Sequence, residues 1–301
     1  MNSSVAAVVV LFKPDLVVLD RLLLSIHEQV QLVYIIDNTP ASSIDDYAGR
    51  FDDGKLFYKS LQDNYGIARA HNVGAQLAEK AGYSHVLLLD QDSELLPGTV
   101  NTLLAEEKKL LDMGVKVGAI GPVFVDEKTG DAAPILRSSF FGTKKIDIDL
   151  DSTLPVLSNY IIASGSLIRV SVFSVVGLMQ ESLFIDWVDI EWGERASIAG
   201  YGSYLTPLVT MRHSIGDEFV TLLGKRITLH SDFRNYFIVR NAAYLAVWSN
   251  TRIQTRFEFA RKVPYYIVCY TLCSKRKLYS AKLLCQAFYD GIARNMFKGR
   301  F

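Results

Sequence analysis

The first 120 residues alternate between short apolar runs rich in β-branched side chains and longer stretches in which Leu and Ile recur with helical spacing. The pattern predicts strands at 5–12, 32–36, 55–60, 84–89 and 115–122, helices at 15–29, 42–51 and 66–81, and a polar hairpin excursion over 123–150. Repeated strand–helix–strand units form parallel, doubly wound sheets, which bind ligands beyond the carboxyl ends of their strands. We therefore expect an α/β fold with a mostly parallel, Rossmann-like sheet.

From about residue 215 this rhythm disappears. Residues 232–248 have a helical pattern rich in aromatic side chains, and residues 252–289 interleave basic residues with aromatic and aliphatic ones. The sequence thus predicts two parts. We expect a catalytic α/β domain over residues 1–215 and a helical C-terminal region over residues 216–301.

Charge is distributed unevenly, although the whole chain holds 32 basic and 32 acidic residues. Residues 251–301 contain 11 Lys/Arg and 2 Asp/Glu, so this region is basic and the body is acidic. Its basic residues are interleaved with Phe257, Phe259, Tyr265, Tyr266, Tyr270 and Tyr279. That combination predicts helices that lie among anionic lipid headgroups. A solvated basic face and a contact in a homo-oligomer are the alternatives, and no nucleic-acid-binding motif accompanies the charge.

The chain carries no feature of a membrane-spanning or exported protein. No uninterrupted apolar run reaches the roughly 20 residues that a spanning helix needs. The first apolar run is short and has neither a basic start nor a cleavage site. We expect a cytoplasmic protein, bound peripherally to the inner face of the cell membrane.

Two acidic clusters carry the candidate chemistry. Asp90 and Asp92 directly follow the predicted strand 84–89, and Asp189 lies in a second cluster about a hundred residues later. Two carboxylates spaced i and i+2 at the end of a strand can hold a hard divalent cation. The alternative is that they cap the next helix. Because Asp37 also follows a predicted strand, a doubly wound sheet would bring it to the same edge.

These residues belong to an ordered series of short motifs. The series comprises Val9-Val10-Leu11-Phe12-Lys13-Pro14, Ile36-Asp37-Asn38, Asn64-Tyr65-Gly66-Ile67-Ala68, Leu88-Leu89-Asp90-Gln91-Asp92-Ser93, Ser164-Gly165-Ser166, residues 184–192, Gly200-Tyr201, residues 213–217, Arg234-Asn235-Tyr236 and Arg240-Asn241. Each motif alone is weak, but the series in order resembles the family 2 glycosyltransferases of GT-A fold. The Asp-Gln-Asp-Ser form of the acidic motif resembles the bacterial rhamnosyltransferases among them.

The resemblance implies a role for each matched residue. Asp37 would contact the nucleotide base, and Asn64, Gly66, Arg69, Asn72, Asp90 and Gln91 would line the site of the nucleotide-sugar donor. Asp90 and Asp92 would hold Mg²⁺ or Mn²⁺ against the diphosphate, with His213 completing the metal shell. Asp189 would be the general base, and Glu191 or Asp186 would orient the catalytic centre.

The implied reaction is an inverting, metal-dependent transfer of L-rhamnose from dTDP-L-rhamnose. The acceptor would be a growing glycan, free or lipid-linked, of an O-antigen-like bacterial surface polysaccharide. One alternative is the same fold with a UDP-hexose or UDP-galactofuranose donor. A nucleotidyltransferase is a further alternative, although the glycine-rich, lysine-bearing phosphate loop expected near the first strand is absent. A non-catalytic sugar-nucleotide-binding scaffold would have lost acids that are all present here.

Overall fold

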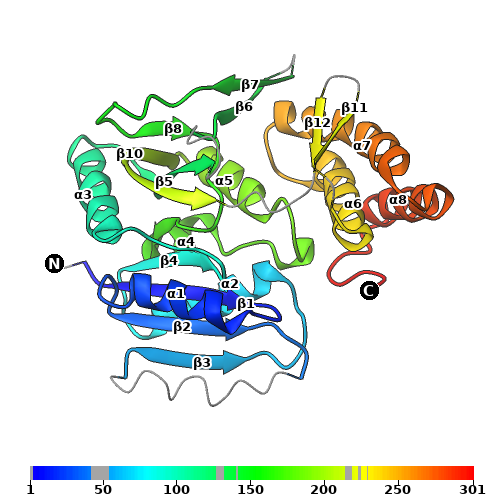
Figure 1. The fold of residues 1–301 in the computed structure, drawn as a ribbon. Coiled ribbons are helices and arrows are strands. Elements are labelled where there is room, and N and C mark those ends of the chain that lie inside the picture. Colours follow the sequence, from blue (N-terminus) through cyan, green and yellow to red (C-terminus); the bar gives the residue numbers. More distant parts are fainter. Residues whose placement is uncertain are drawn as a thin grey trace.

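The computed structural model describes residues 3–41, 54–126, 132–139, 142–213, 219–222, 225–228 and 230–301. Its centre is one eight-stranded sheet with strand order β3-β2-β1-β4-β9-β5-β10-β8 (Figure 1). The strands are β1 (Val5–Leu11), β2 (Leu32–Asp37), β3 (Leu56–Ser60), β4 (His85–Asp90), β5 (Val117–Asp126), β8 (Val156–Ser158), β9 (Leu167–Arg169) and β10 (Gly202–His213). The predicted helix at 42–51 lies outside the described residues.

The sheet is mostly parallel, as predicted. Strands β3, β2, β1 and β4 pair in parallel, as do β5 and β10. The short strand β9 lies antiparallel between β4 and β5, and β8 is antiparallel to β10 at the edge. Two hairpins stand apart from the sheet: β6 (Ile135–Ser139) with β7 (Gly142–Ile146), within the predicted excursion, and β11 (Phe219–Leu222) with β12 (Lys225–Thr228).

Strand β1 explains why the sheet is covered on both faces. All seven of its residues are buried, because alternate side chains enter two separate hydrophobic cores. One core contains α1 (Leu16–Ile26) and α3 (Thr99–Asp112). The other contains α2 (Ile67–Lys80), α4 (Val170–Val176) and α5 (Val188–Ile198). The arrangement is doubly wound.

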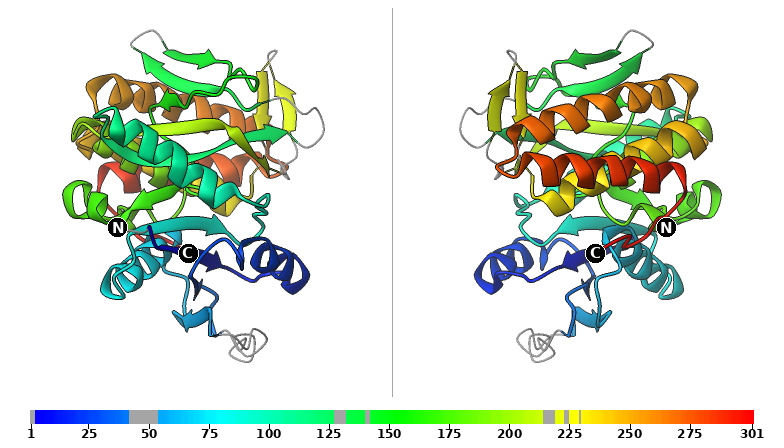
Figure 2. Two further views of the ribbon diagram at one scale, coloured as in Figure 1. Left: turned by 90° about the vertical axis from the view of Figure 1, so that its left-hand side faces the viewer. Right: turned by 90° about the vertical axis from the view of Figure 1, so that its right-hand side faces the viewer.

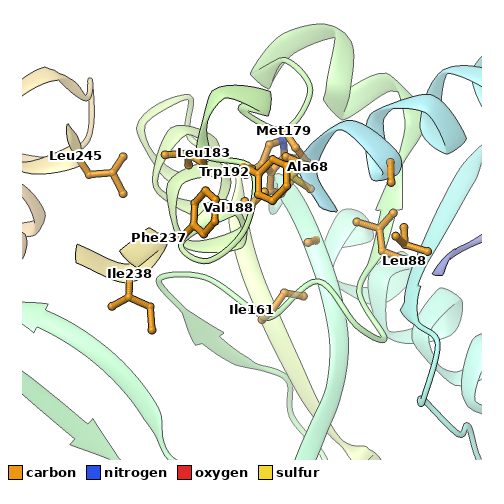
Figure 3. Close-up of a cluster of buried hydrophobic side chains, with 14 of the residues drawn as sticks. Ala68, Leu88, Ile161, Met179, Leu183, Val188, Trp192, Phe237, Ile238 and Leu245 are labelled. Atoms are coloured by element: carbon orange, nitrogen blue, oxygen red, sulfur yellow. The ribbon is translucent and has the colours of Figure 1, made fainter. Parts of the chain in front are cut away.

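The C-terminal region forms α6 (Asp232–Trp248), α7 (Ile253–Cys273) and α8 (Lys277–Ile292), which pack together on one side of the sheet (Figures 1 and 2). Phe237 and Ile238 of α6 belong to the same hydrophobic core as Val188 and Trp192 of α5 (Figure 3). Within the described residues, no helix is both long and apolar enough to cross a membrane. The predicted division near residue 215 falls in a segment outside the description.

Strand register brings the predicted site residues to one edge of the sheet. Leu11 of β1 pairs with Asp37 of β2, and Val10 pairs with Asp90 of β4. Because these strands are parallel, their carboxyl ends share that edge. The expected convergence of Asp37 with Asp90 is therefore present in the fold.

Candidate functional site

A cavity of about 940 Å³ lies between the carboxyl edge of the sheet and helices α6 and α7; we call it the central cavity. The sheet edge and the start of α2 contribute Val10, Phe12, Asn38, Asn64, Gly66, Ile67, His71, Asp90, Gln91 and Asp92. The opposite side contributes Ile162, Ala163, residues 184–190, His230, Phe233, Arg234, Ile238, Tyr265, Tyr266 and Tyr270. The two acidic clusters of the sequence thus face one space.

The carboxyl groups in the central cavity influence one another's protonation. Burial, together with the nearby carboxylates of Asp92 and Asp189, raises the pKa of Asp90 to about 7, against the opposing effect of Arg234. Burial also raises the pKa of Asp189 to about 6, helped by Asp186 and opposed by backbone N–H groups, including that of Ile190. The site therefore concentrates negative charge.

This donor set suits a hard divalent cation. Asp90 and Asp92 offer carboxylate oxygens, and a cation between them would relieve the repulsion that raises the Asp90 pKa. Across the described part of the chain, no group of three or more His, Cys, Asp or Glu side chains is placed to hold a metal ion. Mg²⁺ commonly uses one or two carboxylates and completes its shell with water and substrate phosphates. The side chain of His213, the predicted third ligand, lies outside the description.

The loop before α5 positions Asp186 and Asp189 through a strained backbone. Phe184, Asp186 and Trp187 have φ angles of 66°, 61° and 64°, which non-glycine residues adopt at a cost of about 1–3 kcal/mol each. Asn241 stabilises the loop by donating from Nδ2 to the carbonyl oxygens of Leu183 (2.8 Å), Ile185 (2.7 Å) and Asp186 (3.2 Å).

Arg240 adds a second anchor to the same loop. Its guanidinium is fully buried, donates to the Leu183 carbonyl at 3.0 Å and lies 4.6 Å from the centre of the Phe237 ring. The indole Nε1 of Trp187 donates to the Ile238 carbonyl at 3.0 Å. Helix α6 therefore holds the loop before α5, which gives the Arg240-Asn241 motif a structural explanation.

Asn38, Asn64, Gly66 and Gln91 form the wall of the central cavity on the side of the sheet edge; we call it the amide wall. Asn38 Nδ2 donates to Asn64 Oδ1 at 2.9 Å, and the backbone N–H of Gly66 donates to the same oxygen at 3.0 Å. Gly66 has φ 84°, and a Cβ there would lie 2.4 Å from the Phe184 carbonyl oxygen, so glycine is required for this close approach. Gln91 binds the Phe12 backbone N–H through Oε1 at 2.8 Å.

Asp37 supports this wall from behind. Its side chain is fully buried and does not line the central cavity. Oδ2 accepts from the Tyr58 hydroxyl at 2.8 Å, and Oδ1 accepts from the Thr39 N–H at 2.9 Å. The prediction that Asp37 touches the nucleotide base stays a prediction.

Arg69 and Asn72 do not line the central cavity, contrary to the expectation. Arg69 is exposed and pairs with Glu181 at 3.1 Å. Asn72 is buried, exchanges two 2.9 Å hydrogen bonds with the backbone of Met179, and also donates to Glu181. Residues three apart share a helix face, and this face of α2 is directed at the loop around Glu181.

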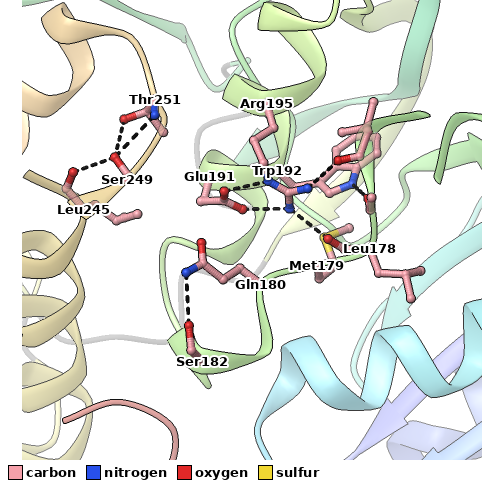
Figure 4. A network of polar contacts seen from close by, with 12 residues as sticks. Leu178, Met179, Gln180, Ser182, Glu191, Trp192, Arg195, Leu245, Ser249 and Thr251 are labelled. Carbon is pink, nitrogen blue, oxygen red and sulfur yellow. Dashed lines mark hydrogen bonds and ion pairs between the residues drawn. The ribbon is translucent and has the colours of Figure 1, made fainter. Parts of the chain in front are cut away.

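Glu191 is likewise placed away from the reaction space. It is buried and forms a bidentate ion pair with Arg195, with oxygen–nitrogen distances of 2.6 and 2.9 Å (Figure 4). Arg195 also donates to the carbonyls of Val176 and Leu178. The side chain of Glu191 therefore ties α5 to the loop after α4 and does not line the central cavity, and its predicted role in orienting the catalytic centre stays a prediction. Asp186 does line the cavity, where it accepts from Arg234 at 3.1 Å.

Three tail aromatics expected at a membrane lie in the cavity wall instead. Tyr265, Tyr266 and Tyr270 of α7 line the central cavity, together with Trp187. The rings of Tyr266 and Tyr270 are stacked, with centroids 5.5 Å apart and planes 8° apart, and Trp187 lies 6.2 Å from Tyr266. We call these four residues the aromatic wall. Phe257 and Tyr279 are exposed, and the predicted membrane contact stays a prediction.

His71 is a further cavity residue that the motif comparison passed over. It lies one helical turn after Ile67 on α2, and both line the central cavity. The sequence could have indicated this residue, because His71 follows the Gly66-Ile67 motif at the spacing of one helical turn. The motif match drew attention to Arg69 and Asn72, which flank His71 and face elsewhere.

No protein-family model matches the chain. The dTDP-rhamnosyl transferase RfbF of Shigella flexneri is 31% identical over 304 residues, which cover 100% of this chain and 99% of that protein. An uncharacterized protein of Mycobacterium tuberculosis is 26% identical over 162 residues, covering 50% of this chain and 54% of its own length.

Two solved structures share the fold. The S. aureus TarS fragment 1–349 in complex with UDP-GlcNAc has a TM-score of 0.58 at 14% identity, covering 96% of this chain and 80% of that one. GalNAc-T7 with UDP, GalNAc and Mn²⁺ has a TM-score of 0.58 at 16% identity, covering 91% of this chain and 58% of that one. These likenesses confirm the predicted fold class.

Proposed function

The chain belongs to the rhamnosyltransferase-like family of GT-A glycosyltransferases, and we propose that it transfers L-rhamnose from dTDP-L-rhamnose to a hydroxyl group of an O-antigen-like bacterial surface polysaccharide. One observation supports the proposal that the chain catalyses this transfer. Asp189, whose pKa is raised to about 6, shares the central cavity with the Asp90/Asp92 pair. A base and a phosphate-binding edge thus face the same space.

Asp189 acts as the general base of a single displacement. The acceptor hydroxyl gives its proton to the Asp189 carboxylate as its oxygen attacks the anomeric carbon of rhamnose. The bond from that carbon to the diphosphate oxygen breaks, and its electron pair leaves with the phosphate. Attack from the side opposite the leaving group inverts the configuration, so a β-linked donor gives an α-linked product.

Asp90 and Asp92 would hold Mg²⁺ or Mn²⁺ at the sheet edge, next to the donor diphosphate. When bound, the cation stabilises the negative charge that develops on the leaving phosphate. The two carboxylates orient the diphosphate end of the donor at the sheet edge. Burial and then the nearby carboxylates of Asp92 and Asp189 raise the Asp90 pKa, and relief of that repulsion by a cation supports this role.

The amide wall of Asn38, Asn64, Gly66 and Gln91 holds the nucleotide end of the donor. Asp37 keeps Tyr58 and the Thr39 backbone in position behind that wall. The backbone carries these groups at the carboxyl ends of β1, β2 and β4, where doubly wound sheets bind nucleotides. A UDP-sugar would use the same wall and is the alternative donor.

The aromatic wall receives the acceptor glycan. A sugar ring has C–H-rich faces that pack against aromatic rings, and Arg234 and His230 beside the wall are hydrogen-bonding side chains for its hydroxyl groups. This wall lies across the cavity from the donor edge, which suits attack opposite the leaving phosphate. The exposed basic residues of α7 and α8 bind anionic lipid, which would hold the protein at the inner membrane face near a lipid-linked acceptor.

Incorporation of labelled sugar tests the proposal directly. Purified protein is incubated with radiolabelled dTDP-L-rhamnose and with membranes that carry O-antigen precursors, in parallel with labelled UDP-glucose and UDP-galactofuranose. We expect label to enter the glycan from dTDP-L-rhamnose alone. Incorporation from a UDP-sugar instead would establish the alternative donor, and release of nucleotide without incorporation would contradict the proposed acceptor.

A further inference from the structure

His71 is a buried polar side chain without a hydrogen-bond partner. It is 2% exposed, and neither Nδ1 nor Nε2 has a partner within the described residues. Burial lowers the pKa of its imidazole to about 4, so the ring is neutral at physiological pH. A neutral imidazole offers one donor and one acceptor, and leaving either unpaired in a protein interior costs about 1–3 kcal/mol.

The surroundings of His71 indicate that a ligand supplies the missing partners. The residues on either side in the motif, Arg69 and Asn72, are hydrogen-bonded to the loop around Glu181. His71 instead lines the central cavity. The other described buried histidine, His85, is satisfied by Ser84 Oγ at 2.8 Å and by Glu107 at 2.7 Å. Of these two buried histidines, His71 lines the cavity and lacks a hydrogen-bond partner for both ring nitrogens.

The position of His71 favours the nucleotide end of the donor. Helix α2 packs against β1, β2 and β4, and its first turn joins the amide wall at Asn64 and Gly66. A neutral ring does not neutralise a diphosphate. It matches an uncharged group that both donates and accepts, such as a nucleoside hydroxyl or the imide edge of a pyrimidine.

We propose that His71 is a donor-binding residue that hydrogen-bonds the nucleoside part of the nucleotide-sugar. The proposal rests on the proposed function, because it takes the cavity to be the donor site. It explains why an unsatisfied histidine is retained: the residue costs stability in the free protein and contributes affinity once the nucleoside is bound.

Calorimetric titration of dTDP into His71→Leu, together with thermal unfolding, tests this role. Leucine fills similar space without polar atoms, so we expect Tm to stay the same or rise while dTDP affinity falls about tenfold. His71→Gln keeps one donor and one acceptor and should retain an intermediate affinity. The matched control is His85→Leu, which removes the hydrogen-bond partner of Glu107 Oε2 and should lower Tm without changing the affinity of the folded protein for dTDP.

Two results would overturn the proposal. One is an unchanged dTDP affinity in folded His71→Leu, and the other is a fall in Tm equal to that of His85→Leu with no specific loss of binding. Failure of the proposed function looks different, because wild-type protein would then bind UDP rather than dTDP. In that case the same variants titrated with UDP decide the role of His71.

Discussion

At the scale of single residues, the chemistry depends on carboxyl groups whose environments differ. Asp189 is placed in the first turn of α5, where backbone N–H groups partly offset the effect of burial on its pKa. Glu191, two residues later, is directed into the protein and pairs with Arg195. Sequence spacing separated these two acids but could not show that Asp189 lines the central cavity and Glu191 does not.

Replacing Asp189 by Asn removes the base and keeps the side-chain shape. We expect kcat to fall by about 10²- to 10⁴-fold, while the dissociation constant of dTDP-L-rhamnose changes little. Stopped-time transfer assays and calorimetry measure the two quantities. Near-normal turnover in this variant would show that another group accepts the proton.

The raised pKa of Asp189 sets the direction of the pH dependence. A general base must be ionised, so activity should fall as pH drops below about 6, by about tenfold per pH unit, and level off above it. The rate profile of kcat/KM between pH 4.5 and 8.5 measures this. The acidic limb at pH 6 should be missing from the residual activity of Asp189→Asn.

At the scale of elements, the loop before α5 and helix α6 form one working unit. The loop adopts left-handed backbone at three non-glycine residues, and Asn241 satisfies three of its carbonyl groups. The sequence marked both the loop and the Arg240-Asn241 motif. It could not show that one holds the other, because about 55 residues separate them and their contact is a property of the folded chain.

Asn241→Ala tests this unit. The three carbonyl groups lose their donor, so we expect the free energy of unfolding to fall by about 1–3 kcal/mol and kcat to fall with it. Urea unfolding and transfer rates give both numbers. Asn101→Ala, at an exposed position on α3, is the control and should change neither.

The aromatic wall is an element-scale feature that composition alone could not place. Tyr265, Tyr266 and Tyr270 share one stretch of α7 with basic residues, and this composition is equally typical of a helix that faces lipid. Packing of α7 toward the cavity decides which face is inside. Helical pattern shows that a helix is amphipathic, but not what covers its apolar face.

Tyr266→Leu should weaken acceptor binding. Loss of the ring face should raise the apparent KM for glycan-bearing membranes about fivefold without changing donor affinity. Tyr279→Leu, exposed on α8 and outside the cavity, is the matched control. Equal effects of the two substitutions would indicate membrane contact rather than a glycan site.

At the scale of the whole molecule, the sheet edge and the C-terminal helices enclose the site together. Hydrophobic periodicity predicted the parallel strands and the edge where Asp37 and Asp90 meet, because burial on both faces leaves a clear local signal in β1 and β4. The antiparallel strand β9 has only three residues, too few to show a pattern. The packing of α6 and α7 over the edge depends on long-range contacts.

Repulsion among the carboxylates links global stability to pH and to metal. Because the pKa of Asp90 is raised in the folded state, the folded protein favours the protonated carboxyl and is destabilised when this group ionises. The stability is therefore fully present below about pH 4 and is lost as pH rises through about 7. At pH 8 without metal, Asp90→Asn should therefore raise the free energy of unfolding, by up to about 4 kcal/mol. Mn²⁺ should raise the Tm of wild-type protein but not that of Asp92→Ala, as thermal scans with and without a chelator would show.

The most direct measurement is calorimetric binding of a panel of sugar nucleotides in the presence of Mn²⁺, Mg²⁺ or a chelator. The proposed function predicts binding that prefers dTDP-L-rhamnose over UDP-glucose, UDP-galactofuranose and UDP-GlcNAc, and that weakens when the chelator removes the metal. Tighter binding of a UDP-sugar, or binding of dTDP-L-rhamnose that is unaffected by the chelator, would contradict it.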